Sequence, residues 1–160
     1  MITTIQALIL STALLWGGSN APETNGTLTT YSKTALPEAP IAVKRHFNGA
    51  FSNGMKGDSL SFDISADGKK LENLTFNGYW RCSGKLEKTV VGPDGAFSIA
   101  NNQVNQHIAE PPNGGSTAWR FELQALIKGK AVSGTFRMNI NNLGCDTYVL
   151  KFTAQEVMKK

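Results

Sequence analysis

Residues 119–140 read WRFELQALIKGKAVSGTFRMNI, and this stretch decides the fold class. Apolar residues occupy every second position on both sides of the turn Lys128-Gly129-Lys130. They are Trp119, Phe121, Leu123, Ala125 and Ile127 before it, then Val132, Gly134, Phe136, Met138 and Ile140 after it. Because successive side chains of a strand point to opposite faces, this alternation predicts two antiparallel strands that share one buried face.

The same pattern continues in both directions from this hairpin. Towards the N-terminus, Leu60, Phe62 and Ile64 alternate with polar residues before the turn Asp67-Gly68. Towards the C-terminus, residues 145–154 form an expected last strand, with Tyr148, Leu150 and Phe152 in one row. Seven or eight short strands with no amphipathic helix between them predict an all-β fold, an antiparallel β-sandwich or jelly roll over residues 47–156.

Composition fits a folded domain and gives little sign of nucleic acid binding. The chain has 160 residues, of which 41% are hydrophobic and 18% charged. Its net charge is +4, but Lys and Arg are scattered in small groups such as Lys44-Arg45 and Lys69-Lys70. Such groups are typical of a solvated surface, so we expect no nucleic acid partner.

The N-terminus resembles a secretion signal. Residues 5–16 form an apolar run too short to cross a bilayer, and small residues follow at Ser19-Asn20-Ala21. We expect a signal peptide over residues 1–21, with Ser19 as an alternative last residue because Pro22 would hinder cleavage after Ala21. The first segment has no Lys or Arg, so a buried N-terminal helix or strand is the alternative. An exported protein, extracellular or periplasmic, without a membrane span in its mature form is predicted.

Residues 22–46 are rich in Thr, Ser, Ala and Pro and have no apolar period. This composition predicts an extended linker. Its Thr-rich part, residues 27–31, could add as a strand to the sheet edge of another copy, so self-assembly through residues 22–46 is one hypothesis for the function.

Cys82 and Cys145 are the two cysteines of the chain. In an exported protein two cysteines are expected to form a disulfide, because thiols do not persist in an oxidising compartment. The alternative is a metal site, but the nearest candidate ligand, His107, has no companion at metal-ligand spacing. We therefore expect a disulfide, no metal and no cofactor.

The residues most suggestive of binding are Tyr79-Trp80-Arg81 and Trp119-Arg120. Aromatic rings beside guanidinium groups suit flat ligands such as sugar rings. Alternation places Trp80 on the face of Cys82, and Trp119 in the row of Phe121, so core packing is favoured for both tryptophans. Tyr79, Arg81 and Arg120 then face outward and are the candidate binding residues.

No catalytic residues are predicted. Asp58, Asp67 and Asp94 lie in turns, where Asp caps the backbone, and neither His46 nor His107 belongs to a catalytic motif. A pair of glycosidase carboxylates could still come from distant parts of the chain.

The strand pattern also resembles a family. The resemblance rests on segments 60–65 with Asp67-Gly68-Lys69, on Cys82, on 95–98, on 130–137, and on 145–147 with 152–154. These segments, about two thirds of the chain, resemble small secreted bacterial β-sandwich domains of unassigned function. The resemblance implies the fold and export and carries no catalytic residue.

Three functions follow as hypotheses. The first is a non-enzymatic domain that binds or displays at the cell surface, with a polysaccharide or cell-surface component as partner. The second is a structural subunit that assembles by N-terminal strand addition. The third is a glycan-acting hydrolase or lyase, which a concave sheet face with exposed aromatics and paired carboxylates would favour.

Overall fold

The computed structural model describes residues 42–158. The expected signal peptide and residues 22–41 of the expected linker lie outside the described residues. In residues 42–158 the secondary structure consists of strands and one turn of 3-10 helix. These elements are β1 (Arg45–Phe51), β2 (Ser59–Ile64), β3 (Lys70–Cys82), β4 (Lys85–Val91), β5 (Phe97–Ser98), β6 (Gln103–Glu110), β7 (Trp119–Lys128), β8 (Ala131–Ile140), η1 (Asn141–Leu143), β9 (Cys145–Asp146) and β10 (Leu150–Val157). No helix within these residues is long and apolar enough to cross a membrane.

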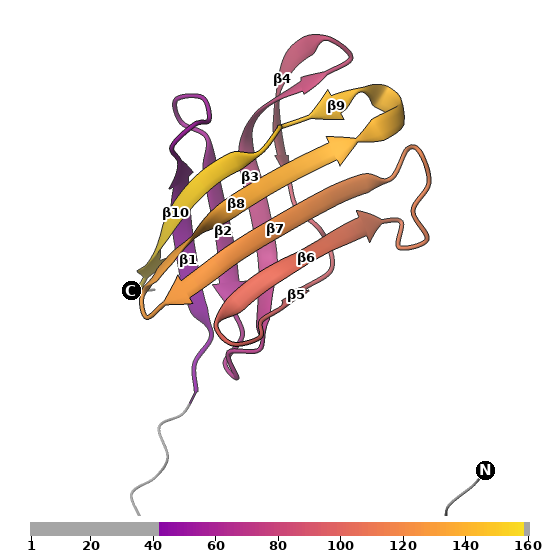
Figure 1. Ribbon diagram of the computed structural model, residues 1–160. Helices are drawn as coiled ribbons and strands as arrows, with labels where there is room; N and C mark the ends of the chain where they lie inside the picture. Colours follow the sequence, from indigo (N-terminus) through magenta and orange to yellow (C-terminus); the bar gives the residue numbers. More distant parts are fainter. Residues whose placement is uncertain (1–41, 159–160) are drawn as a thin grey trace, which may run out of the picture. The chain divides into compact units, whose positions relative to one another are not determined.

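Six of the strands close into a ring. In order, β10, β1, β2, β3, β9 and β8 each pair with the next, and β8 pairs again with β10, always antiparallel. Beyond the ring, β7 pairs with β8 and β6 with β7, while β4 and β5 pair with β3. Figure 1 shows β6, β7, β8 and β10 as one layer in front of β1, β2 and β3. The fold is therefore a closed barrel with extra strands.

The all-β class and the disulfide expected from the sequence are confirmed. The finer expectation of a β-sandwich or jelly roll is replaced by the closed ring. Closure depends on which strand edges meet in space, at the β3–β9 and β8–β10 pairings. Alternation along a single strand reports its buried face but not its neighbours.

Phenylalanine rings fill the inside of the ring. Phe47, Phe62, Phe76 and Phe136 are fully buried. The ring centroids of Phe47 and Phe62 are 5.3 Å apart, and those of Phe76 and Phe136 are 5.5 Å apart. Barrel diameter grows with strand number, and an eight-stranded barrel is just wide enough to be filled by side chains, so a six-stranded ring filled by phenylalanines leaves the outer surface as the place for binding.

The expected apolar rows face this core. The buried positions include all three expected residues of β2, the row of β7 from Phe121 onward, and the apolar side chains of the β8 row: Leu60, Phe62, Ile64, Phe121, Leu123, Ala125, Ile127, Val132, Phe136, Met138 and Ile140. Gly134 belongs to the same row for a steric reason. A Cβ there would lie 1.9 Å from the carbonyl oxygen of Gln124, so the close approach of β7 and β8 requires glycine.

A bulge interrupts the alternation in β3. Its register with β2 shifts between Ser61 and Asp63, and Asn73 adopts a left-handed φ of 54°. The extra residue explains why the buried Leu71 and Leu74 are three positions apart rather than two.

The C-terminal segment differs from the single strand expected over residues 145–154. β9 ends at Asp146 and β10 begins at Leu150. Leu150 and Phe152 are buried as expected, but Tyr148 is 62% exposed, with a left-handed φ of 55°. The prediction that Tyr148 lies in the core row is wrong, because this residue belongs to a turn. Two hydrogen bonds hold the turn: Asp146 Oδ1 accepts the N–H of Tyr148, and the hydroxyl oxygen of Thr147 accepts the N–H of Met138.

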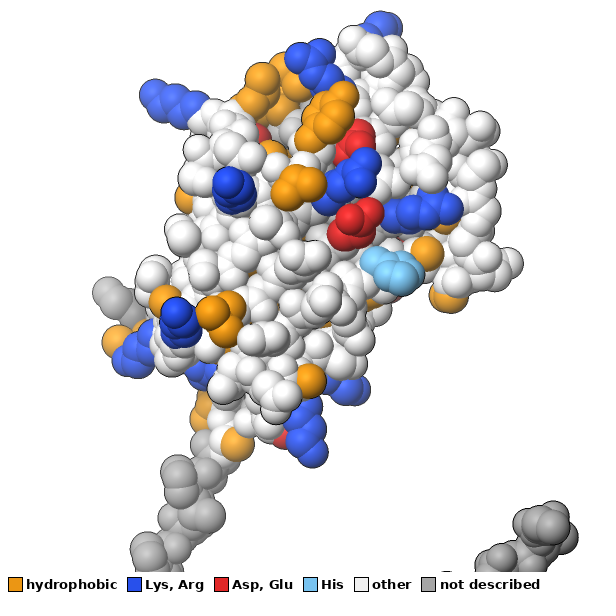
Figure 2. All heavy atoms as spheres, viewed as in Figure 1, with side chains coloured by type: hydrophobic (Ala, Val, Ile, Leu, Met, Phe, Trp, Pro, Cys, Tyr) orange, Lys and Arg blue, Asp and Glu red, His pale blue; other side chains and the backbone are white. Residues whose placement is uncertain are grey.

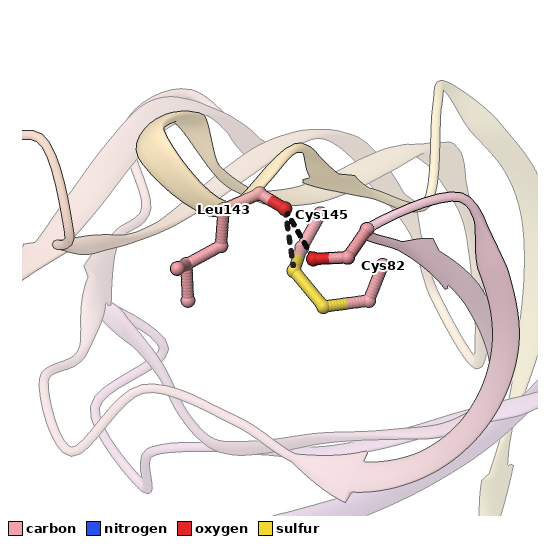
Figure 3. Close-up of a disulfide and its surroundings, with 4 residues drawn as sticks. Cys82, Leu143 and Cys145 are labelled. Atoms are coloured by element: carbon pink, nitrogen blue, oxygen red, sulfur yellow. Dashed lines mark hydrogen bonds between the residues drawn. A yellow bond between two sulfur atoms is a disulfide. The ribbon is translucent and has the colours of Figure 1, made fainter.

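The disulfide between Cys82 and Cys145 ties the weakest part of the ring. β3 and β9 are joined through one residue pair, Arg81 with Asp146, and Cys82 and Cys145 are the next residues of the two strands, facing each other on the same side of that pair. Figure 3 shows the bridge beneath the carbonyl of Leu143, whose oxygen also accepts the hydroxyl of Ser83 at 3.0 Å. The bridge and this hydrogen bond fasten the tip of the β3–β4 hairpin to η1 and β9.

Candidate functional site

The outer face of β6, β7 and β8 carries three adjoining hollows, which we call the β7 groove. Their volumes are about 340, 250 and 220 Å³. Gln124, near the middle of β7, lines all three. The other polar side chains that line them are Gln103, Asn105, Gln106, His107, Arg120, Glu122, Ser133, Thr135 and Arg137.

The centre of the groove is a row of uncharged hydrogen-bonding groups. Asn105, Gln124 and Thr135 lie opposite one another on β6, β7 and β8. Within residues 42–158 their side chains make no hydrogen bond to the protein, and neither does that of Ser133. Figure 2 shows this face mostly in white, the colour of polar uncharged side chains and backbone. The amide and hydroxyl groups are therefore available to a ligand.

A charged cluster forms one end of the groove. The guanidinium of Arg137 donates to both carboxylate oxygens of Asp146, at 3.1 and 2.7 Å, and lies 3.8 Å from Glu122. The hydrogen bond to Asp146 is the largest cause that raises the pKa of Arg137 above its ordinary value. Glu122 is the one carboxylate among the described residues that line the hollows, and it lies beside the guanidinium of Arg137, which is already paired with Asp146.

Arg120, one of the three candidate binding residues, lies on the rim of this groove. Its guanidinium donates to the carbonyl oxygen of Gly115 at 2.9 Å and lies 3.5 Å from that of Ala118. It therefore holds the β6–β7 loop as well as facing the hollow. Across the strands from it lies Asn139, whose buried Oδ1 has no hydrogen-bond partner among the described residues.

Tyr79 and Arg81 belong to a second surface, at the end of the barrel where the β3–β4 hairpin projects. We call it the end surface and define it by Met55, Tyr79, Arg81, Leu86, Tyr148 and Val149. All but Val149 line a hollow of about 180 Å³ between the β1–β2 loop, the hairpin and the β9–β10 turn. All six side chains are exposed.

The three candidate residues are thus divided between two surfaces. Backbone register connects them, since Arg81, Asp146, Asn139 and Arg120 lie side by side on successive strands of the ring and β7. Tyr79 and Arg81 face outward from β3 as alternation predicts. Trp80, which lies between these two residues in the sequence, is buried. Its ring stacks on that of Trp119 with centroids 5.1 Å apart, and both tryptophans pack against the core.

A third polar cluster lies around His46, which is part of β1 rather than of an extended linker. Its Nδ1 lies 2.6 Å from Asp63, and Asn73 donates to the other oxygen of Asp63 at 2.8 Å. Burial by itself raises the pKa of Asp63, but the hydrogen bonds from Asn73 and His46 outweigh it, so this pKa lies below its ordinary value. Among the described residues no hydroxyl or thiol bonds to His46, so the imidazole has no serine, threonine or cysteine to activate.

Some of these residues had no signal in the sequence. Tyr148 and Asp146 come close to Arg81 through the pairing of β9 with β3, although they lie some 65 residues further along the chain. The β7 groove was equally hidden, because Asn105, Gln124 and Thr135 stand at ordinary outward positions of three strands. Outward alternation identifies such residues, and only their register brings them together.

No protein-family model matches the sequence, and no curated protein or solved structure matches it either.

Proposed function

We propose that the chain is an exported, non-enzymatic domain that binds a neutral polysaccharide along the β7 groove. The observation that carries the proposal is the row Asn105, Gln124 and Thr135, whose uncharged side chains make no hydrogen bond to the described protein. Amides and hydroxyls both donate and accept, as sugar hydroxyls do.

The spacing of the row supports the same ligand. Neighbouring strands lie about 4.8 Å apart, close to the length of one pyranose unit along an extended glycan. A glycan that crosses β6, β7 and β8 would therefore meet one polar side chain on each strand. Leu126 and Val149, which also line the hollows, offer apolar contacts for the C–H groups of a sugar.

Binding without hydrolysis is favoured by the carboxylates. Glycoside hydrolysis needs two carboxyl groups on either side of the scissile bond. The groove has Glu122 alone among its described lining residues, and that carboxylate is paired with Arg137. The aromatic side chains that line the groove are His107 and the buried Phe136.

The experiment is affinity gel electrophoresis in gels that contain xylan, laminarin or galactomannan. We expect retardation in at least one gel, and a loss of retardation in Gln124→Ala and Asn105→Ala. Asn48→Ala, at an exposed site on β1, is the matched control and should migrate like the unmodified protein. Unretarded migration in every neutral glycan, or equal retardation of the Gln124 variant, would refute the proposal.

Export is part of the proposal, supported by the apolar run near the N-terminus and by the disulfide, which is typical of oxidising compartments. The intact mass of protein from its native host, measured without reductant, tests it. We expect a mass that lacks about 19 to 24 N-terminal residues. A full-length mass in large assemblies would instead favour assembly through residues 22–46.

A further inference from the structure

The end surface differs in chemistry from the β7 groove. Tyr148, Val149, Leu86 and Met55 are each between 45% and 62% exposed, and all come to one end of the molecule. Figure 2 shows hydrophobic side chains gathered at this end, next to the charged cluster. Gathered apolar side chains on a folded domain mark an interaction surface, and Tyr, Met and Arg are enriched at such surfaces.

The carboxylates of this surface are already used by the protein itself. Asp58 is buried and accepts the N–H of Met55 at 2.7 Å and that of Tyr79 at 3.1 Å. Asp146 accepts from Arg137 and from the N–H of Tyr148. The asparagine of the hollow, Asn53, donates to one backbone group of the β10 segment and accepts from another. Few acceptors therefore remain for a sugar.

The positively charged side chains of this surface, unlike its carboxylates, have no partner among the described residues. Arg81 is exposed and makes no ion pair or hydrogen bond through its side chain within residues 42–158. Lys88 lies opposite Tyr79 on β4, so its side chain shares the outward face of Tyr79 and Arg81, and it is exposed and without an ion pair in the same part of the chain. Glu87, opposite Trp80, and Lys85, opposite Cys82, alternate to the other face of the hairpin. The surface thus presents apolar side chains with unpaired positive charge and few free acceptors.

The surface is also held in place before any partner binds. The disulfide and the Ser83 bond to Leu143 fasten the β3–β4 hairpin to η1 and β9. Asn53 bonds the β1–β2 loop to Val149 and Lys151, and Asp58 bonds the same loop to Tyr79. A fixed surface loses little conformational entropy on binding.

We propose that the end surface docks a protein segment in which carboxylate side chains stand next to apolar ones. The apolar side chains of the partner would cover Tyr79, Leu86 and Tyr148, and its carboxylates would pair with Arg81 and Lys88. The argument is charge complementarity, and it is independent of the polysaccharide proposal because its cations lie outside the groove; of the six residues that define the end surface, Val149 is the one that also lines the groove. The domain would then hold a glycan on one side and a protein on its end.

The test is a titration of the oxidised, ¹⁵N-labelled protein with a twelve-residue peptide that alternates Glu with Leu and Phe, followed by NMR. We expect amide shifts confined to residues 53–58, 79–88 and 146–149. The peptide with Lys in place of Glu should produce no such shifts. Arg81→Glu should weaken binding at least tenfold, and Leu86→Ala should weaken it while keeping every charge. Lys128→Glu, at the last residue of β7 and at the other end of the barrel, is the matched control and should bind normally.

Three results would overturn the proposal. Equal binding of the Lys and Glu peptides would remove the charge argument. Shifts that map to another face would remove the site. Phosphatidylglycerol vesicles that displace the Glu peptide from residues 79–88 and bind more tightly would assign the surface to a lipid headgroup instead of a protein. None of these results bears on retardation by neutral glycans, so the two proposals can fail separately.

Discussion

At the scale of single residues, Asp58 connects two loops through one buried carboxylate. One oxygen accepts the N–H of Met55 in the β1–β2 loop, and the other accepts the N–H of Tyr79 on β3. Gly78 leaves room for it, since a Cβ there would lie 2.8 Å from the carboxyl group of Asp58. The position of Met55 against Tyr79 in the end surface therefore depends on this side chain.

Replacing Asp58 with alanine should destabilise the fold by about 2 to 3 kcal/mol, because two backbone N–H groups lose their acceptor. Urea unfolding followed by tryptophan fluorescence measures this. Asp94→Ala, at an exposed turn position, is the control and should change stability by less than about 0.5 kcal/mol. An Asp58 variant as stable as the Asp94 variant would mean that water replaces the carboxylate at no cost.

Asp63 should make the stability depend on acidic pH. Its folded pKa lies below the ordinary 3.8, so its ionised form stabilises the native state. This contribution is complete above the unfolded pKa and is lost as the pH falls through the folded pKa, below about pH 4. Asp63→Asn should be the less stable protein at pH 6, and its deficit should shrink between pH 5 and pH 2 in urea unfolding. A deficit that stays constant over this range would show that packing, not charge, is what the substitution removes.

At the scale of elements, alternation was a good guide wherever a strand runs without interruption. The rows of β2, β7 and β8 were predictable because one face of each strand is buried and the other solvated. The row of β3 could be predicted only in part, since the bulge at Asn73 moves Leu74 to the face that simple alternation gives to its neighbour. The segment around Tyr148 failed for a related reason, because side-chain hydrogen bonds end the strand pairing there.

The β9 element depends on the disulfide more than any other. It pairs with β3 through a single residue and with β8 through two. Cys145→Ser should lower the stability by about 4 kcal/mol, the loss expected from opening a loop of this length in the chain-entropy model. Thermal unfolding with and without reductant checks this, and the reductant should have no effect on the variant.

The loss of stability in Cys145→Ser should be larger near the disulfide than in the rest of the barrel. Amide exchange at Arg81, Asp146 and Tyr148 should speed up in Cys145→Ser more than exchange at Phe121 or Phe136, which lie in long pairings. If all of these amides exchange faster by the same factor, the disulfide stabilises the barrel as a whole and not the pairing of β3 with β9 in particular.

At the scale of the whole molecule, the ring could not be predicted from the sequence because it is closed by partners from opposite ends of the domain. β1 pairs with β10, and β10 in turn pairs with β8. The same closure explains why the outward direction of Tyr79, Arg81 and Arg120 was predictable and their distribution over two surfaces was not. Outward direction is a property of one strand, whereas a surface is made by the order of strands around the ring.

Ring closure leads to a prediction about which part of the chain folds. Residues 42–158 contain every strand of the ring, its disulfide and its core, so this segment should fold alone and unfold within about 3 °C of the oxidised full chain in calorimetry, a difference of less than about 1 kcal/mol. A segment that stops at Val149 loses β10, which exposes the edges of β1 and β8 and removes the buried Leu150, Phe152 and Ala154. It should show no cooperative unfolding transition even with the disulfide formed. A stable 42–149 segment would mean that the two layers hold together through their side chains alone, and that the hydrogen-bonded ring is a consequence of the fold rather than a condition for it.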